Sequence, residues 1–189
     1  MIAIRYARVG AWMVAVALAT PAAAQQVTLM TGPQGGSWVP LGGALKNMWE
    51  SAIPGLQIQQ QPGAGIANVR GVDEGKAQIG FGNSSTTVDG VEGRAPYPRK
   101  TTKVCQVANL YPQYFQVVAL TDAKVNSFAD LQGKTLVTQS KGNTAEALTG
   151  DILKLNGMTY QSLAKVSFQA SYTDAVDMMK DGHVQVFTL

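Results

Sequence analysis

Two glycine-containing loops carry the residues with the clearest capacity for chemistry. Gly35-Gly36-Ser37 and Gly142-Asn143-Thr144 each follow a short β-type run and end in a hydroxyl residue where an amphipathic stretch begins. Glycine lets the backbone approach a ligand closely, and we expect Ser37 and Thr144 to cap the helices that start there. The amides and the positive dipole end of such a helix attract a carboxylate, phosphate or similar anion. The pair therefore predicts an anion site if both loops face one cleft.

Neither loop has the pattern of a nucleotide-phosphate site. The first loop reads Gly-Pro-Gln-Gly-Gly-Ser and lacks the Gly-Lys-Ser/Thr ending, and Lys141 stands before its glycine rather than after it. The sequence thus disfavours nucleotide hydrolysis. Two ordinary strand-to-helix connections with ordinary caps are the alternative interpretation.

Two further groups of residues are placed to contact a ligand. Asn83-Ser84-Ser85-Thr86 follows a predicted strand, and open α/β sheets bind ligands beyond the carboxyl ends of their strands. Tyr111 and Tyr114 flank Pro112 where one domain is expected to pass to the next, so an aromatic ring there would wall a cleft. A solvated turn is the alternative for the first group, and simple packing is the alternative for the tyrosines.

Short β-rich runs alternate with amphipathic stretches, which is typical of α/β proteins with parallel strands. In the first half, the pattern predicts strands at 27–30, 56–60 and 78–81, helices at 38–52 and 66–74, and a surface loop over 88–103 with a helical turn at its start. Apolar runs follow at 103–110 and 115–120. Trp38, Leu41, Leu45, Met48, Trp49 and Ala52 give the 38–52 helix one apolar face.

The second half repeats the first at a constant offset of 107 residues. Thr135-Leu136-Val137-Thr138 corresponds to Thr28-Leu29-Met30-Thr31, and the two glycine loops correspond as well. Helix faces follow at 145–155 and 172–179, and a strand is expected at 184–189. A constant offset across strand, loop and helix predicts two equivalent units, although chance alignment of general α/β patterns is the alternative. We therefore expect lobes at 25–112 and 113–189.

The chain ends inside the last predicted strand. A strand of a parallel sheet normally needs helices on both of its faces, and no residues follow to supply them. The sequence therefore predicts a second lobe that is incomplete.

The first 24 residues have the composition of a secretory signal peptide. Arg5 and Arg8 precede an apolar run from 9 to 19, and Ala22-Ala23-Ala24 forms a cleavage site before Gln25. An uncleaved anchor is the alternative, but the run is shorter than the roughly 20 residues that span a bilayer. Without the leader, 13 basic residues face 12 acidic ones, a net charge of +1. That charge gives no electrostatic basis for binding nucleic acid, and the expected location is the periplasm.

One cysteine and one histidine leave little for catalysis or metal binding. Cys105 cannot form an intramolecular disulfide, and we expect it to be a small buried hydrophobe rather than a reactive thiol. His183 follows Asp181-Gly182 in a predicted turn and is expected at the surface. The two residues do not make a zinc site or a Cys/His dyad, so the sequence predicts no metal, no cofactor and no enzyme.

Several segments, in their order and spacing, resemble the TAXI family, the solute receptors of tripartite ATP-independent periplasmic (TRAP) transporters. The resemblance covers essentially the whole chain after the leader. The segments that carry it are Gly35-Gly36-Ser37-Trp38-Val39-Pro40-Leu41-Gly42, Pro62-Gly63-Ala64-Gly65-Ile66-Ala67-Asn68-Val69-Arg70, Glu74-Gly75-Lys76-Ala77-Gln78-Ile79-Gly80-Phe81 with Asn83-Ser84, Leu110-Tyr111-Pro112, Phe128-Ala129-Asp130-Leu131-Gln132-Gly133-Lys134 and Lys141-Gly142-Asn143-Thr144-Ala145-Glu146.

The resemblance implies a two-lobed clamshell of the periplasmic binding protein type (type II), which closes on a solute and delivers it to a permease driven by an ion gradient. It further implies a monomer and a small anionic or zwitterionic ligand, a carboxylate or an amino acid such as glutamate or glutamine. By position, it assigns Gly36, Ser37 and Trp38 to one side of the site, Asn83 and Ser84 to its floor, Tyr111 to the hinge side, and Gly142, Asn143 and Thr144 to the opposing lobe.

Three other functions stay open from the sequence. The same architecture hosts enzymes, although the acidic residues here lie mostly on helix faces or in turns. A binding protein that serves an ABC transporter or a sensor kinase is a second alternative. A nonfunctional remnant of a longer receptor is the third.

Overall fold

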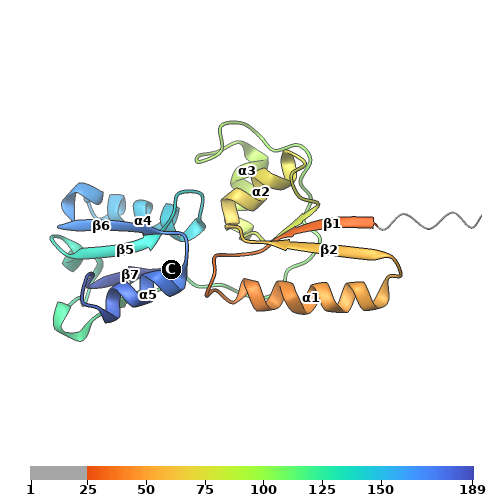
Figure 1. Cartoon of the computed structure of the whole chain (residues 1–189). Coiled ribbons are helices and arrows are strands. Elements are labelled where there is room, and N and C mark those ends of the chain that lie inside the picture. Colours follow the sequence, from red (N-terminus) through yellow and green to blue (C-terminus); the bar gives the residue numbers. More distant parts are fainter. Residues whose placement is uncertain (1–24) are drawn as a thin grey trace, which may run out of the picture.

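The computed structural model describes residues 25–189 as two α/β lobes that lie side by side (Figure 1). The predicted signal peptide, residues 1–24, lies outside the described residues. We call the part from β1 to α3 the N-terminal lobe and the part from β4 to β7 the C-terminal lobe. Their boundary at 112/113 stays a prediction. Within residues 25–189, no helix combines the length and the hydropathy needed to cross a membrane.

The N-terminal lobe contains a parallel three-stranded sheet in the order β2-β1-β3. α1 covers one face of this sheet, and α2 and α3 lie on the other (Figure 1). The elements are β1 (Gln25–Met30), α1 (Trp38–Ala52), β2 (Leu56–Gln61), α2 (Gly65–Asp73), β3 (Ile79–Gly80) and α3 (Ser84–Glu92).

The C-terminal lobe contains a mixed four-stranded sheet in the order β4-β7-β5-β6, in which β4 runs antiparallel to β7. α4 and α5 cover its opposite faces (Figure 1). The elements are β4 (Val117–Ala119), β5 (Thr135–Gln139), α4 (Thr144–Leu155), β6 (Lys165–Gln169), α5 (Tyr172–Lys180) and β7 (Val186–Thr188), with 3-10 turns at Thr121–Ala123, Phe128–Leu131 and Tyr160–Ser162.

The two lobes share one topology, as the repeat of 107 residues predicts. The parallel order β2-β1-β3 corresponds to β6-β5-β7. α2 spans 65–73 and α5 spans 172–180, so these two helices match at that offset from end to end. The α/β fold class is confirmed, and β4 is an addition with no counterpart in the described part of the N-terminal lobe.

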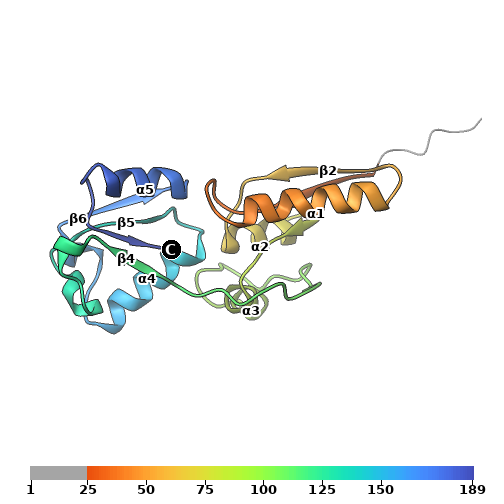
Figure 2. The ribbon, with the colours of Figure 1, turned by 90° about the horizontal axis from the view of Figure 1, so that it is seen from below.

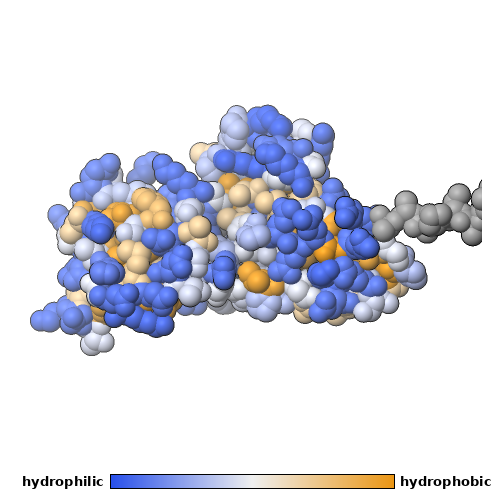
Figure 3. All heavy atoms as spheres, viewed as in Figure 1, coloured by the Kyte–Doolittle hydropathy of each residue, from blue (hydrophilic) through white to orange (hydrophobic). Residues whose placement is uncertain are grey.

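Alternation along the central strand β5 directs its side chains to two cores. Leu136 packs with Leu131, Leu153 and Val186 in one cluster, whereas Val137 packs with Ala175, Met179 and Phe187 in another. Successive strand residues point to opposite faces of a sheet, so one strand serves both layers. On the face seen in Figure 3, hydrophobic residues gather over the C-terminal lobe and are framed by hydrophilic ones.

Residues 81–116 differ most from the sequence prediction. The expected turn at 83–86 is the start of α3, a helix of nine residues that ends at Gly93 with φ of +72°. Its Ser, Thr and Gly content gives a weak helix propensity, which packing on α2 overrides. The apolar run at 103–110 forms no strand. It is part of an extended segment, shown in green in Figure 2, that runs past α3 towards the C-terminal lobe.

The prediction that Cys105 is buried was wrong, because this extended segment leaves its side chain exposed. The start of the segment is held by Asp73, whose Oδ1 accepts from the amides of Thr102 and Lys103 at 2.7 and 3.0 Å. These bonds, followed by the charge of Arg99, lower the pKa of Asp73. His183 is exposed, as predicted.

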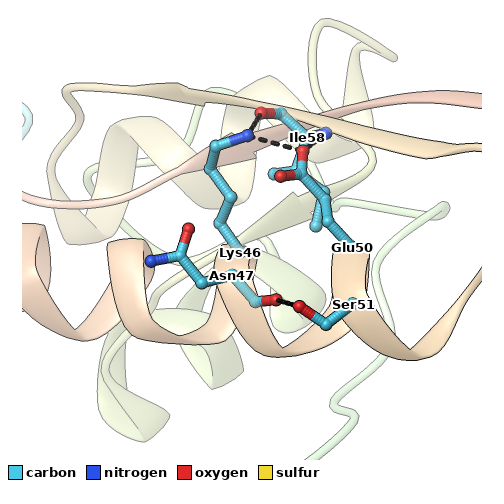
Figure 4. A network of polar contacts seen from close by, with 5 residues as sticks. All are labelled: Lys46, Asn47, Glu50, Ser51 and Ile58. Carbon is cyan, nitrogen blue, oxygen red and sulfur yellow. Dashed lines mark hydrogen bonds and ion pairs between the residues drawn. The ribbon is translucent and has the colours of Figure 1, made fainter.

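The outer edge of β2 is closed by two side chains of α1 rather than by another strand (Figure 4). Glu50 Oε1 accepts from the Ile58 amide at 2.5 Å, and Lys46 Nζ donates to the Ile58 carbonyl at 2.8 Å. Lys46 and Glu50 also form an i,i+4 ion pair. Unpaired backbone groups on an edge strand invite pairing with another chain, so this network both attaches α1 and protects the edge.

We expect Glu50→Gln to lower the melting temperature at pH 7 and to lose that effect in acid. The Ile58 amide, and after it Lys46, lower the pKa of Glu50. A carboxyl whose folded pKa is depressed contributes stability above its unfolded value, about 4.3, and loses it as the pH falls through the folded value. Melting curves of both proteins from pH 7 to pH 3 should therefore converge.

The exposed Asp151 on α4 provides the matched control. Asp151→Asn is expected to give a curve parallel to that of the wild type over the whole range. If the Glu50→Gln and wild-type curves also stayed parallel, the ion pair would not contribute to folding.

Candidate functional site

The carboxyl ends of the parallel strands in the two lobes face each other across a cavity of about 440 Å³ (Figure 1). The loops after β1, β3 and β5 and the first residues of α1, α3, α4 and α5 line it. Eight of the nine predicted site residues are among the lining residues: Gly36, Ser37, Trp38, Asn83, Ser84, Tyr111, Asn143 and Thr144. Gly142 is not among them, because its carbonyl oxygen bonds to the other lobe. The ligand role of all nine stays a prediction.

Asn68 holds the N-terminal side of the cavity in shape. Its side chain is fully buried, and its Nδ2 donates to the carbonyl oxygens of Thr31 at 2.7 Å and Phe81 at 2.8 Å, with a longer bond to Met30 at 3.4 Å. Its Oδ1 accepts from the Ala64 amide at 3.0 Å. One side chain thus ties the ends of β1 and β3 to the start of α2. Sequence reasoning placed Asn68 within a motif but gave it no role.

The start of α1 forms one wall. Ser37 occupies the N-cap position, but its hydroxyl makes no capping bond, contrary to the sequence prediction. The Ser37 Oγ instead lies 3.4 Å from the hydroxyl of Tyr111, on the extended segment. Trp38 packs edge-on against Phe81, with ring centroids 5.6 Å apart. Gly32 lies against Trp38, and a Cβ there would come within 2.9 Å of the Trp38 Cβ.

The start of α3 forms the floor and meets the opposite lobe. Asn83 Oδ1 accepts from the hydroxyl of Thr144 at 2.7 Å, and Asn83 Nδ2 donates to Gln113 Oε1 at 2.6 Å. Asn83 therefore joins α3, the extended segment and α4. Ser84 and Ser85 follow it, exposed and lining the cavity.

The cap of α4 is Asn143, not Thr144 as predicted. Asn143 Oδ1 accepts from the Ala145 amide at 2.8 Å. A single-residue shift in the helix start accounts for the difference, since Thr144 is already helical and is free to reach Asn83. Both residues belong to the site, with exchanged tasks.

Tyr172, the first residue of α5, lines the cavity and was missed by sequence reasoning. Its ring lies under Gly36, where a Cβ would come within 2.8 Å of the Tyr172 Cε2, and it packs on Phe187 at 6.0 Å between centroids. Burial raises the pKa of Tyr172, although a hydrogen bond with Asn143 acts in the opposite direction. The hydroxyl therefore stays protonated at neutral pH. Its position at the 107-residue equivalent of Gly65 was the available signal.

The lobes cap each other through two backbone hydrogen bonds. The Tyr172 amide of α5 donates to the Gln34 carbonyl at 2.9 Å, and the Ala67 amide of α2 donates to the Gly142 carbonyl at 3.1 Å. α2 and α5 are equivalent helices, and the loops that supply the two carbonyls are the matched glycine loops. The interface is therefore close to two-fold symmetric, and it brings both loops to one cleft.

The cavity has no ionic side chain among its described lining residues, because Asp, Glu, Lys, Arg and His are all absent from them. Residues 25–189 also hold no cluster of three or more His, Cys, Asp or Glu suited to a metal ion. Recognition in this cleft therefore falls to backbone groups, hydroxyls, side-chain amides and aromatic walls.

Solved structures with the same fold are solute-binding proteins by their descriptions. The alkanesulfonate-binding protein SsuA from Xanthomonas axonopodis pv. citri, bound to MOPS, has 17% identity and a TM-score of 0.56 over 87% of this chain and 54% of its own. PhnD1 from Prochlorococcus marinus, in complex with methylphosphonate, has 12% identity and a TM-score of 0.59 over 87% and 63%. A putative L-cystine ABC transporter protein from Listeria monocytogenes has 16% identity and a TM-score of 0.56 over 87% and 68%.

This chain thus spans 54% and 63% of the lengths of SsuA and PhnD1. The likeness shows the fold, which is that of periplasmic binding proteins, as predicted. At the level of sequence, residues 29–189 match the NMT1-like family. The specific resemblance to TAXI receptors is not what this match establishes. The chain belongs to the NMT1-like family and has the periplasmic binding protein fold.

Proposed function

We propose that the protein is the extracytoplasmic solute-binding component of a membrane transporter. The observation that carries the proposal is the cavity between two lobes of equal topology, lined from both sides by helix N-termini and polar loops. A small anionic or zwitterionic solute would bind there as a monomeric protein closes on it. The leader at 1–24 supports export to the periplasm.

An ABC-type transporter is the favoured partner. The neighbours with TM-scores above 0.5 include a putative ABC transporter protein for L-cystine, besides binding proteins for alkanesulfonate and methylphosphonate. The second candidate is a TRAP permease, which the motifs around the two glycine loops favour, with glutamate, glutamine or a related carboxylate as the solute.

Uptake measurements in cells separate the two transporter classes. An ABC system is expected to stop when ATP is depleted while the ion gradient is kept, and a TRAP system is expected to stop when an ionophore collapses the gradient. Either result assigns the energy source, and gene deletion supplies the background rate.

The composition of the cleft argues against an enzyme. The described lining residues offer no carboxylate, imidazole, thiol or amine to act as acid, base or nucleophile at neutral pH, and Tyr172 is held protonated. Turnover of a bound solute would overturn this assignment.

Thermal unfolding of the chain from Gln25 with a solute panel tests the proposal. The panel contains sulfonates, phosphonates, dicarboxylates, glutamate, glutamine, cystine and aromatic acids. A solute at about 100 times its dissociation constant adds roughly 2.7 kcal/mol, which raises the melting temperature of a domain of this size by about 5 to 10 °C. A shift for one chemical class supports the function, and a cooperative transition that no class of solute moves contradicts it.

A further inference from the structure

Two helices begin at the cavity with their first-turn amides lacking a side-chain cap. Within the described chain, neither Ser37 at α1 nor Asn83 at α3 bonds to a first-turn amide of its helix. α4 differs, because Asn143 caps it. Ser37, Ser84 and Ser85 line the cavity beside these amides. Free first-turn amides carry positive partial charge, so this side of the cavity is rich in hydrogen-bond donors.

The acceptors around the cavity are, by contrast, already engaged within the protein. The carbonyl oxygens of the matched loops bind across the lobes, Gln34 to the Tyr172 amide and Gly142 to the Ala67 amide. At the strand ends, the Thr31 and Phe81 carbonyls accept from Asn68. The remaining engaged acceptors are Asn83 Oδ1, which takes the Thr144 hydroxyl, and the Pro33 carbonyl, which takes the Gly36 amide at 3.1 Å.

No carboxylate compensates for this shortage of acceptors. Glu146 and Asp174 lie in the first turns of α4 and α5, but neither is among the residues that line the cavity. Glu146 is directed to Tyr160, whose hydroxyl lies 3.2 Å from its Oε1. An ammonium group that entered the cavity would lose its hydration without gaining a charged partner, which is costly.

We propose that the solute of this cleft is an anion that carries no ammonium or other cationic group. Its acidic group binds the first turns of α1 and α3, and an apolar or aromatic body lies against Trp38 and Phe81. The inference rests on the proposed function and narrows it, because it removes amino acids from the solute class. The cavity of about 440 Å³ holds more than a bare acidic group.

Calorimetric titration of the full mature chain with matched pairs of probes tests the inference. Each pair differs in an ammonium group: ethanesulfonate and taurine, ethylphosphonate and 2-aminoethylphosphonate, pentanoate and L-norvaline, glutarate and L-glutamate. The member without the ammonium group is expected to bind at least about ten-fold more tightly, since an unpaired buried charge costs more than 1.4 kcal/mol.

A charge variant gives a second, independent measurement. Ser85→Asp places a carboxylate in the first turn of α3, where it competes with the acidic group of the probe. We expect its binding of the preferred probe to fall by at least about ten-fold, while its melting temperature without a probe rises, because an acid stabilises a helix N-terminus. Ser85→Asn is the neutral control of nearly equal size and should retain binding.

The outcomes separate the inference from the function on which it rests. Equal or tighter binding of the amino member overturns the inference and leaves the solute-binding function standing. The same holds if Ser85→Asp binds its probe as well as Ser85→Asn does. If neither these probes nor the broader panel binds, the solute-binding function is overturned, and the inference falls with it.

Discussion

Replacing Asn68 by alanine is expected to lower the free energy of unfolding by about 3 to 5 kcal/mol. The side chain is fully buried and bonds to the carbonyl oxygens of Thr31 and Phe81 and to the Ala64 amide. Alanine leaves these groups buried without partners, at a cost of about 1 to 3 kcal/mol each before relaxation. Urea unfolding followed by circular dichroism measures the change as a lower midpoint at an unchanged slope.

Two further variants test whether the hydrogen bonds are the cause. Asn68→Asp keeps the volume but replaces the donor with an acceptor that faces two carbonyl oxygens, so its effect should equal or exceed that of alanine. Asn47→Ala, on the exposed face of α1, should change the free energy by less than about 0.5 kcal/mol. If Asn68→Asp unfolded like the wild type, the amide would not be what holds the strand ends together.

The same residue shows why the sequence predicted the elements better than their connections. Strands and helices follow from local periodicity, so α1 was predicted with its observed bounds, and the two equivalent units followed from the constant offset. Asn68 lies on a helix whose local pattern says nothing of the strand ends 37 and 13 residues away that it joins. Its role depends on tertiary structure.

The candidate site divides in a similar way. The matched glycine loops were predictable, because a strand, a glycine and a polar residue before a helix form a local pattern. The exchange of tasks between Asn143 and Thr144 was not, since it depends on a helix start that shifts by one residue and on the partner Asn83 across the cleft. Tyr172 was missed because its sequence context is that of an ordinary helix face.

The extended segment shows the limit of hydropathy as a signal. The run at 103–110 has the composition of a strand, yet Val107 is 89% exposed and Cys105 is exposed as well. An apolar run becomes a strand when a partner offers it a ladder of hydrogen bonds, and no described strand pairs with this segment. Composition alone therefore overestimated both its order and its burial.

Replacing Gly65 by alanine is expected to weaken solute binding by at least about ten-fold, with little loss of stability. A Cβ at this position would come within 2.4 Å of Thr144 Oγ1 and 2.6 Å of Asn83 Oδ1. These two atoms form the 2.7 Å hydrogen bond that joins the lobes. A methyl group there breaks the bond or moves the lobes apart, and either change disrupts the cavity. The N-terminal lobe itself should tolerate alanine, because alanine favours a helix over glycine by about 1 kcal/mol.

Titration with the solute that gives the largest thermal shift measures this loss, and small-angle X-ray scattering of the same variant reports an increased radius of gyration. Gly43→Ala is the matched control, because it is also a helical glycine but its Cβ would meet only Gln60 Oε1, at 3.7 Å. It should bind normally and unfold at an equal or higher temperature. Unchanged affinity in Gly65→Ala would mean that solute binds without the close approach of α2 and α4. In that case the lobe contact would be a property of the fold alone, and the cleft would have to recognise its solute through one lobe.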